Sequence, residues 1–85
     1  MVWEVVLARS AAKQLRKLPA SDRQRILAAP RQMESDPFSG DIAYLKSQPS
    51  AFHRRVGNWR ILYDLDFERR VVGVAAIVRR TSTTY

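Results

Sequence analysis

The residues best suited to chemistry are concentrated in the stretch FHRRVGNWRILY, residues 52 to 63. It contains the only histidine of the sequence, His53, together with Arg54, Arg55 and Arg60. Arginine binds phosphate or carboxylate through a planar, bidentate fork, and histidine transfers protons near neutral pH. This combination predicts a site that holds a phosphate and moves a proton, as RNA binding and cleavage require.

A hairpin predicted in this stretch decides which of these side chains share a face. Gly57-Asn58 suits a two-residue loop between strands at 52–56 and 59–65, which places Arg55 opposite Arg60. Two facing cations repel unless an anion lies between them; alternatively, both turn to solvent or pair with Asp64 or Asp41. Alternation predicts one face that lies under helices (Phe52, Arg54, Val56, Trp59, Ile61, Tyr63) and one open face (His53, Arg55, Arg60, Leu62).

The end of the chain predicts a second contribution to the open face. If the apolar run VVGVAAIV, residues 71 to 78, is the neighbouring strand, its end brings Arg79 and Arg80 to the same side, followed by Tyr85. Lys46 joins Arg54 and Arg55 as a candidate RNA- or phosphate-binding residue. The alternative is that the two arginines only protect a strand edge and that the terminal tyrosine is frayed.

The segments before the hairpin predict one strand and two helices that support it. Residues 2 to 7 form the strand, and Ser10 is the expected N-cap of a helix that Pro19 ends. Ser21 or Asp22 is expected to cap a second helix, from about 21 to 35, kinked at Pro30. The residues expected to face the core are Ala8, Ala12, Leu15 and Leu18 in the first helix and Ile26, Leu27 and Met33 in the second.

The remaining segments complete the predicted fold. SDPFSGD, residues 35 to 41, is a loop; residues 42 to 45 are a short extended piece; and residues 66 to 70 are a turn. The order β-α-α-β-β-β predicts an α+β domain in which an antiparallel pair of helices packs on one face of a small, mainly antiparallel sheet.

Composition sets limits on the class of protein. A chain of 85 residues, taken as one domain over 1–85, carries a net charge of +7 from 12 arginines and 3 lysines against 8 acidic residues. Nucleic acid and an acidic protein are therefore the natural partners, and self-repulsion favours a monomer. The absence of cysteine and the single histidine predict no metal and no other cofactor. Without an apolar run of about 18 residues or a signal peptide, a cytoplasmic location is expected.

Four motifs in order along the chain resemble the RelE/ParE superfamily of toxins from type II toxin–antitoxin systems, and its RelE branch more than ParE. They are SAAKQLRKLP, SDPFSGD followed by YLK, the hairpin RRVGNWRILYDLD, and a final RR before Tyr85. The resemblance implies a RelE-like fold and a metal-independent endoribonuclease that cuts mRNA, typically on the ribosome. It also implies an acidic antitoxin that binds the toxin in a hetero-oligomer.

The resemblance also implies roles for single residues. Arg60 matches the hairpin arginine that stabilises the phosphate, Arg79 or Arg80 the arginine after the last strand, and Tyr85 the carboxy-terminal tyrosine. RelE-type enzymes often have lysines on the strand before the hairpin, where this chain has His53 and Arg55, so His53 is the candidate base. Two alternatives stay open: a ParE-like toxin that inhibits gyrase without nuclease activity, and a degenerate toxin that acts only as a binding or co-repressor module.

Overall fold

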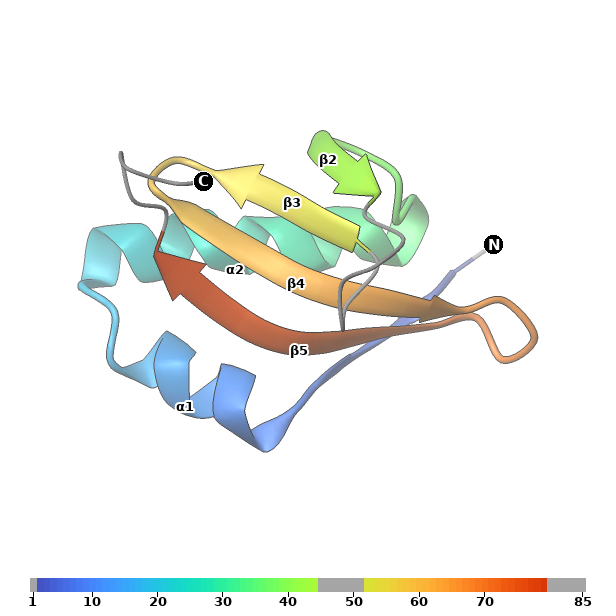
Figure 1. The fold of residues 1–85 in the computed structure, drawn as a ribbon, viewed down its shortest axis with the longest axis horizontal. Coiled ribbons are helices and arrows are strands. Elements are labelled where there is room, and N and C mark those ends of the chain that lie inside the picture. Colours follow the sequence, from blue (N-terminus) through green and yellow to red (C-terminus); the bar gives the residue numbers. More distant parts are fainter. Residues whose placement is uncertain (1, 45–51, 80–85) are drawn as a thin grey trace.

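The computed structural model describes residues 2–44 and 52–79 of the chain (Figure 1). The predicted α+β class is confirmed, and the extended piece predicted near 42–45 forms a short strand. Along the chain the elements are β1 (Glu4–Leu7), α1 (Arg9–Arg16), α2 (Ala20–Ser35), β2 (Asp41–Tyr44), β3 (Phe52–Val56), β4 (Trp59–Asp66) and β5 (Val71–Arg79).

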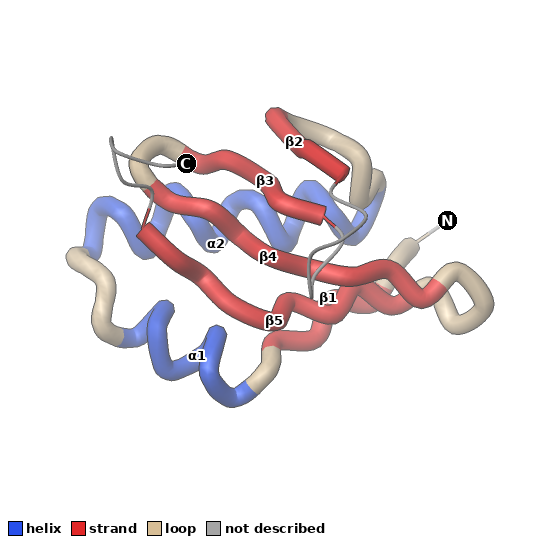
Figure 2. The backbone as a smooth tube through the Cα atoms, viewed as in Figure 1, coloured by secondary structure: helices blue, strands red, loops and turns tan. Residues whose placement is uncertain are grey.

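The strands form a single sheet in the order β1-β5-β4-β3-β2 (Figure 2). Only the β1–β5 pair is parallel, so the sheet is mainly antiparallel, as predicted. The apolar run predicted to be an interior strand is β5, which pairs with β4 on one side and with β1 on the other. Since β1 ends at Leu7, only Val71 to Val74 of β5 have a strand partner on that side.

Helix α1 takes over this edge of β5 where β1 stops. The backbone N–H of Ala8 donates to the carbonyl of Val74 at 2.8 Å, and the Ser10 hydroxyl donates to the carbonyl of Ala75 at 3.0 Å. The backbone N–H of Ile77 in turn donates to Oε1 of Gln14 at 2.7 Å. The prediction that Ser10 is the N-cap is therefore wrong. Ala8 is the N-cap and makes no side-chain hydrogen bond, while the Ser10 hydroxyl bonds to the edge of β5.

Helix α2 lies behind the sheet in Figure 1 and supplies much of the buried surface. It begins at Ala20 with Pro19 at the N-cap, so the predicted caps Ser21 and Asp22 lie inside the helix, and it continues through Pro30 to Ser35. Ile26 and Met33 are buried as predicted, whereas Leu27 is 40% exposed on the outer side of the helix. Ala29 takes its place, because positions 26, 29 and 33 follow the helical period.

The core lies between these helices and one face of the sheet. Tyr63, Ile61, Val72 and Val74 are at most 1% exposed and meet Met33 and other apolar residues of the helices. The hydroxyl of buried Tyr63 donates to the carbonyl of Pro37 at 2.8 Å, so its polar end is satisfied. Burial raises the pKa of Tyr63, which keeps the phenol protonated.

A β-bulge interrupts the pairing of β4 with β5. Leu62 lies opposite Ala76 and Tyr63 lies opposite Val74, which leaves Ala75 as the extra residue. Side chains on either side of a bulge no longer follow simple alternation. Val72 and Val74 therefore share the covered face with Ile77, which an unbroken strand would have turned to the other side.

The loop between α2 and β2 is held by Arg54, the only charged side chain that is buried among the described residues, with 7% exposure. Its guanidinium donates to Oε1 of Gln32 on α2 and, at 3.2 Å, to Oγ of Ser39. Gly40 adopts a φ of +83° beside this group, and a β-carbon there would lie 2.8 Å from the guanidinium. Glycine is required on both counts, since L side chains rarely adopt such a φ and the arginine cannot move away without losing its partners.

Replacement of Gly40 by alanine is expected to lower the free energy of unfolding by about 1–3 kcal/mol, from backbone strain and displacement of Arg54. Gly73→Ala is the matched control: a β-carbon there would lie 4.0 Å from the Asp64 carbonyl, an ordinary contact. We expect this control to be neutral or slightly stabilising, within about 1 kcal/mol. Urea denaturation followed by circular dichroism measures both, and equal stabilities of the two variants would contradict the role given to Gly40.

Candidate nucleic-acid interface

The candidate interface is built on the β3–β4 hairpin, whose register agrees with the prediction. Val56 pairs with Trp59, Arg55 with Arg60, and His53 with Leu62 across the ladder. Gly57 carries the positive φ, 58°, that the first position of a tight hairpin turn demands. Because this loop has only two residues, the faces of both strands are fixed by the turn.

Alternation along the hairpin separates a covered face from an open face. Ile61 and Tyr63 point toward the helices and are buried, as predicted, whereas Arg55 is exposed and Arg60 is half-buried on the open side. Trp59 is half-buried instead of buried, because it is the first residue of β4, at the end of the hairpin. The two arginines face each other across the ladder, so the open face has a local concentration of positive charge.

His53 lies on the same open face, half-buried and opposite Leu62. Its Nε2 is buried and has no hydrogen-bond partner among the described residues. Burial, and to a lesser degree the positive charge of Arg60, lower the pKa of His53 below its usual 6.5. The imidazole is therefore neutral at physiological pH and is able to accept a proton.

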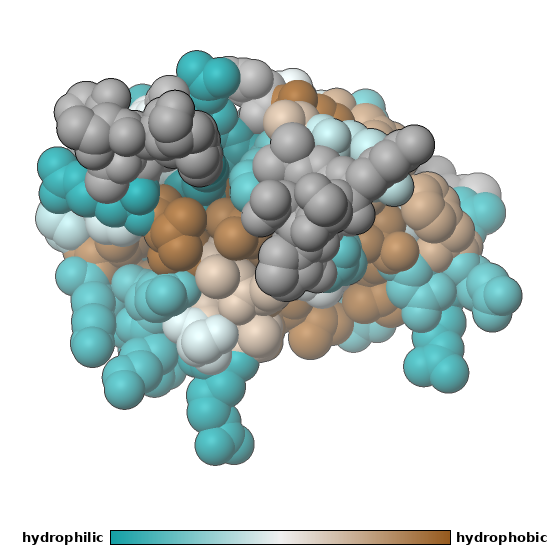
Figure 3. Space-filling view, viewed as in Figure 1, coloured by the Kyte–Doolittle hydropathy of each residue, from teal (hydrophilic) through white to brown (hydrophobic). Residues whose placement is uncertain are grey.

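Beside these polar groups the open face has an apolar floor, formed by Leu62, Ala76 and Val78. Val78 lies opposite Arg60, and Ala76 lies opposite Leu62, so the floor adjoins the cations directly. All three residues are partly exposed, and neither of the two described helices covers this side of the sheet. In the space-filling view, apolar residues occupy the middle of this face and hydrophilic side chains gather toward its margins (Figure 3). Such a surface suits a nucleobase next to its phosphate.

Arg79 does not join the open face, in contrast to the prediction. It is the last residue of β5, opposite Trp59, and its guanidinium carbon lies 5.9 Å from the centre of the Trp59 ring. The bulge at Ala75 shifts the alternation of β5 and turns Arg79 to the side of Trp59, away from Arg60. A single apolar run such as VVGVAAIV contains no sequence signal for the bulge. Lys46, Arg80 and Tyr85 lie outside the described residues.

Arg54 is also removed from the candidate phosphate-binding residues. It lies on the covered face between Gln32 and Ser39, where the hairpin alternation already placed it. Sequence reasoning missed Arg25, which reaches from α2 to the hairpin turn. A β-carbon on Gly57 would lie 3.0 Å from Nη2 of Arg25, so the glycine allows this close approach of a further cation.

Within residues 2–44 and 52–79, acidic residues and His53 form no cluster of three that could hold a metal ion. In the same part of the chain, neither helix has the length and apolar character needed to cross a membrane.

Comparison with known proteins identifies the fold. No family model and no curated protein sequence matches the chain. Among solved structures, RelE in the archaeal RelE–RelB complex of Pyrococcus horikoshii aligns with a TM-score of 0.85 at 20% identity, covering 98% of this chain and 100% of that one. The RelBE2 toxin–antitoxin complex of Mycobacterium tuberculosis gives 0.80 at 23% identity, covering 94% and 100%. The isolated Escherichia coli RelE toxin gives 0.78 at 18% identity, covering 95% and 87%.

The architecture is therefore that of a small α+β domain with two helices packed on a mainly antiparallel sheet. More particularly, the chain has the RelE fold over nearly its whole length, as its sequence motifs predicted.

The electrostatic environment of His53 gives a direct test by NMR. Because the chain has one histidine, its imidazole resonances are unambiguous, and they are expected to titrate below pH 6.5. Arg60→Ala is expected to raise this pKa only in part, because burial is the larger cause and remains. A pKa at or above 6.5 in the unaltered chain, or no change in the variant, would contradict the proximity of these two groups.

Proposed function

We propose that the chain is the toxin of a type II toxin–antitoxin pair and acts as a metal-independent endoribonuclease on mRNA. The observation that carries this proposal is the juxtaposition of Arg55, Arg60 and His53 on the open face of a sheet with the RelE fold. Cleavage by the ribose 2′-hydroxyl needs a base for that hydroxyl, cations for the charge on the phosphorane, and an acid for the leaving 5′-oxygen. The open face offers side chains for the first two requirements.

Arg60 is the proposed ligand of the scissile phosphate. It is half-buried on the open face, between Arg55 on β3 and Val78 of the apolar floor. Arg55, directly opposite, binds the same or the adjacent phosphate through its own guanidinium. The floor of Leu62, Ala76 and Val78 packs against the neighbouring base.

His53 is the proposed base. Its lowered pKa keeps the imidazole neutral at physiological pH, and this form can take the proton of the 2′-hydroxyl. Arginine cannot do so, since it stays protonated at any pH at which the protein is folded. His53 thus carries out the proton transfer that the lysines of RelE-type enzymes would otherwise carry out.

The remaining roles belong to residues outside the described ranges. Since the Arg79 guanidinium lies over the Trp59 ring, Arg80 is the proposed arginine after the last strand, and Tyr85 is the proposed phenol that stacks on a base or donates a proton. Lys46 is the proposed contact to a flanking phosphate. The ribosome is the expected place of action, where mRNA is held in a single-stranded conformation.

The proposed protein partner is an acidic antitoxin. Several RelE structures with this fold were solved as complexes with RelB antitoxins. The net charge of +7 favours an acidic segment over the open face, where it would compete with RNA for Arg55 and Arg60.

Arg60→Ala is expected to reduce mRNA cleavage about 100-fold or more, since one cation at the phosphate is lost. Its fold is expected to be retained, because Arg60 points away from the core. Arg31→Ala removes an exposed arginine from α2 and serves as the matched control with unchanged cleavage. Primer extension on RNA from cells expressing each variant maps the cuts, and growth is followed in parallel.

The outcomes of this experiment separate the alternatives. Growth arrest that persists in Arg60→Ala without any cleavage would favour a gyrase-inhibiting toxin of the ParE kind. Neither arrest nor cleavage by the unaltered chain, with antitoxin binding intact, would indicate a binding or co-repressor module.

The pH dependence of cleavage tests His53 separately. A base acts when unprotonated, so the rate in single-turnover experiments is expected to rise with pH through the lowered pKa of His53 and to level off at a lower pH than it would with an ordinary histidine. His53→Gln is expected to be slower and to lack this rise. A variant with the same profile as the unaltered chain would assign the base to another residue.

A further inference from the structure

Three aromatic side chains, two of them exposed and one half-buried, form a patch at the end of the sheet opposite the β3–β4 turn. This aromatic patch consists of Trp3 before β1, Phe38 before β2 and Phe67 in the β4–β5 turn. The Trp3 and Phe67 rings meet edge to face at 5.8 Å between centroids, and those of Phe38 and Phe67 stack at 6.4 Å. Phe38 is 47% and Phe67 62% exposed, whereas large apolar side chains normally gain free energy from burial.

The patch packs on the aromatic core beneath it. The Phe38 ring packs against Phe52 at 5.8 Å, and Phe52 stacks on the fully buried Tyr63 at 5.5 Å. Phe38 is also fixed through its backbone N–H, which donates to Oδ1 of Asp36 at 3.0 Å. Aromatic groups that are already ordered lose little conformational entropy when a partner covers them, which is a property of binding hot spots.

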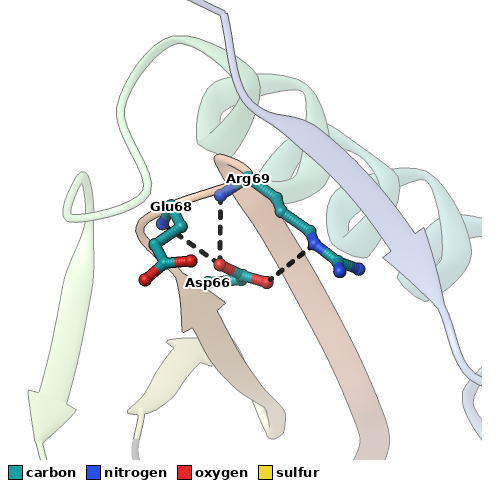
Figure 4. Close-up of polar contacts among 3 residues, drawn as sticks. All are labelled: Asp66, Glu68 and Arg69. Carbon is teal, nitrogen blue, oxygen red and sulfur yellow. Dashed lines mark hydrogen bonds and ion pairs between the residues drawn. The ribbon is translucent and has the colours of Figure 1, made fainter.

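The layers of the fold explain why the patch is uncovered. Helix α2 ends at Ser35, while β4 and β5 continue into a turn that projects beyond the helix layer (Figure 1). Asp66 holds this turn: its Oδ1 accepts hydrogen bonds from the backbone N–H groups of Glu68 and Arg69, both at 3.1 Å, and its Oδ2 lies 4.0 Å from Nε of Arg69 (Figure 4). The turn is thus formed without Phe67, whose ring is left for contacts outside it.

Charge indicates which kind of partner fits. Six of the eight acidic residues belong to the elements that meet at this end: Glu4 begins β1, Glu34 and Asp36 lie at the end of α2, Asp64 and Asp66 close β4, and Glu68 lies in the β4–β5 turn with Arg69 and Arg70, whereas Asp22 and Asp41 lie elsewhere. Arg55, Arg60, Arg25 and Arg79 lie toward the other end, at the β3–β4 turn. An acidic surround repels nucleic acid and favours a polypeptide that carries lysine or arginine beside apolar side chains.

We propose that the aromatic patch docks an apolar, basic segment of the antitoxin, separate from the acidic segment that covers the open face. This inference rests on the proposed function, which supplies the antitoxin. The antitoxin would then match the charge polarity of the toxin at both ends. Two linked contacts raise the overall affinity above that of either one through effective concentration.

The test measures binding of the purified antitoxin, the product of the reading frame adjacent to that of this chain, by isothermal titration calorimetry. Phe67→Ala is expected to weaken binding about 10-fold or more, since exposed aromatic anchors dominate such interfaces. Leu27→Ala is the matched control, an apolar residue 40% exposed on the outer side of α2, with little expected effect. Thermal denaturation verifies that both variants are folded.

A charge variant tests the chemistry of the segment. Glu68→Lys leaves the backbone bonds of the turn in place and is expected to weaken antitoxin binding several-fold. Unchanged affinity in Phe67→Ala, an equal loss in Leu27→Ala, or tighter binding by Glu68→Lys would overturn the proposal. So would slower mRNA cleavage by Phe67→Ala without antitoxin, which would make the patch an RNA or ribosome contact. Binding is measured without reference to cleavage, so absence of nuclease activity in the unaltered chain would not be mistaken for failure of this inference.

Discussion

The two-residue turn at Gly57 and Asn58 is the constraint on which the candidate interface depends. A two-residue turn allows only one register between β3 and β4. Because side chains alternate between the two faces of the sheet, this register decides which face each residue of both strands occupies. A shift by one residue would bury Arg60 under the helices and expose Ile61 and Tyr63. The core and the open face are thus two results of the same register, so a change that shifts one also shifts the other.

Neighbouring arginines in this hairpin show how position decides the role of a charge. Arg54 is turned inward, where Gln32 and Ser39 accept its hydrogen bonds, and it ties the end of α2 to β3. Arg55, the next residue, is turned outward to the open face. Burying a guanidinium costs free energy unless its donors are satisfied; neutral oxygens accept from Nη1 and Nη2 of Arg54, whereas its buried Nε has no partner among the described residues. Arg55 remains accessible to an anionic partner.

Much of this arrangement follows from the sequence, because a tight turn and the alternation of side chains depend on residues that are close together in the chain. The Gly57-Asn58 turn, the pairing of Arg55 with Arg60 and the burial of Ile61 and Tyr63 all follow from period two and turn chemistry. Arg79 was placed on the wrong face because the bulge at Ala75 arises from packing between β4 and β5. The predictions for Ser10 as N-cap and for Leu27 as a core residue are wrong for the same kind of reason, because both depend on tertiary contacts. The Ser10 hydroxyl bonds to the edge of β5, and Ala29 is buried against the sheet in place of Leu27. The aromatic patch joins residues far apart in sequence, so no local pattern indicates it.

The parallel pairing of β1 with β5 has a consequence for synthesis of the chain. The strand partners of Glu4 to Leu7 are Val71 to Val74, so β1, which is synthesised first, cannot pair until β5 has been synthesised. Contacts of such long sequence separation form late, after most of the loop-closure entropy has been lost. The hairpin that carries Arg55 and Arg60 can pair earlier, but its support from β5 is missing until then. A chain whose translation stops before β5 emerges therefore lacks the interior strand of its sheet, and truncated products should be left to proteolysis instead of accumulating as folded protein.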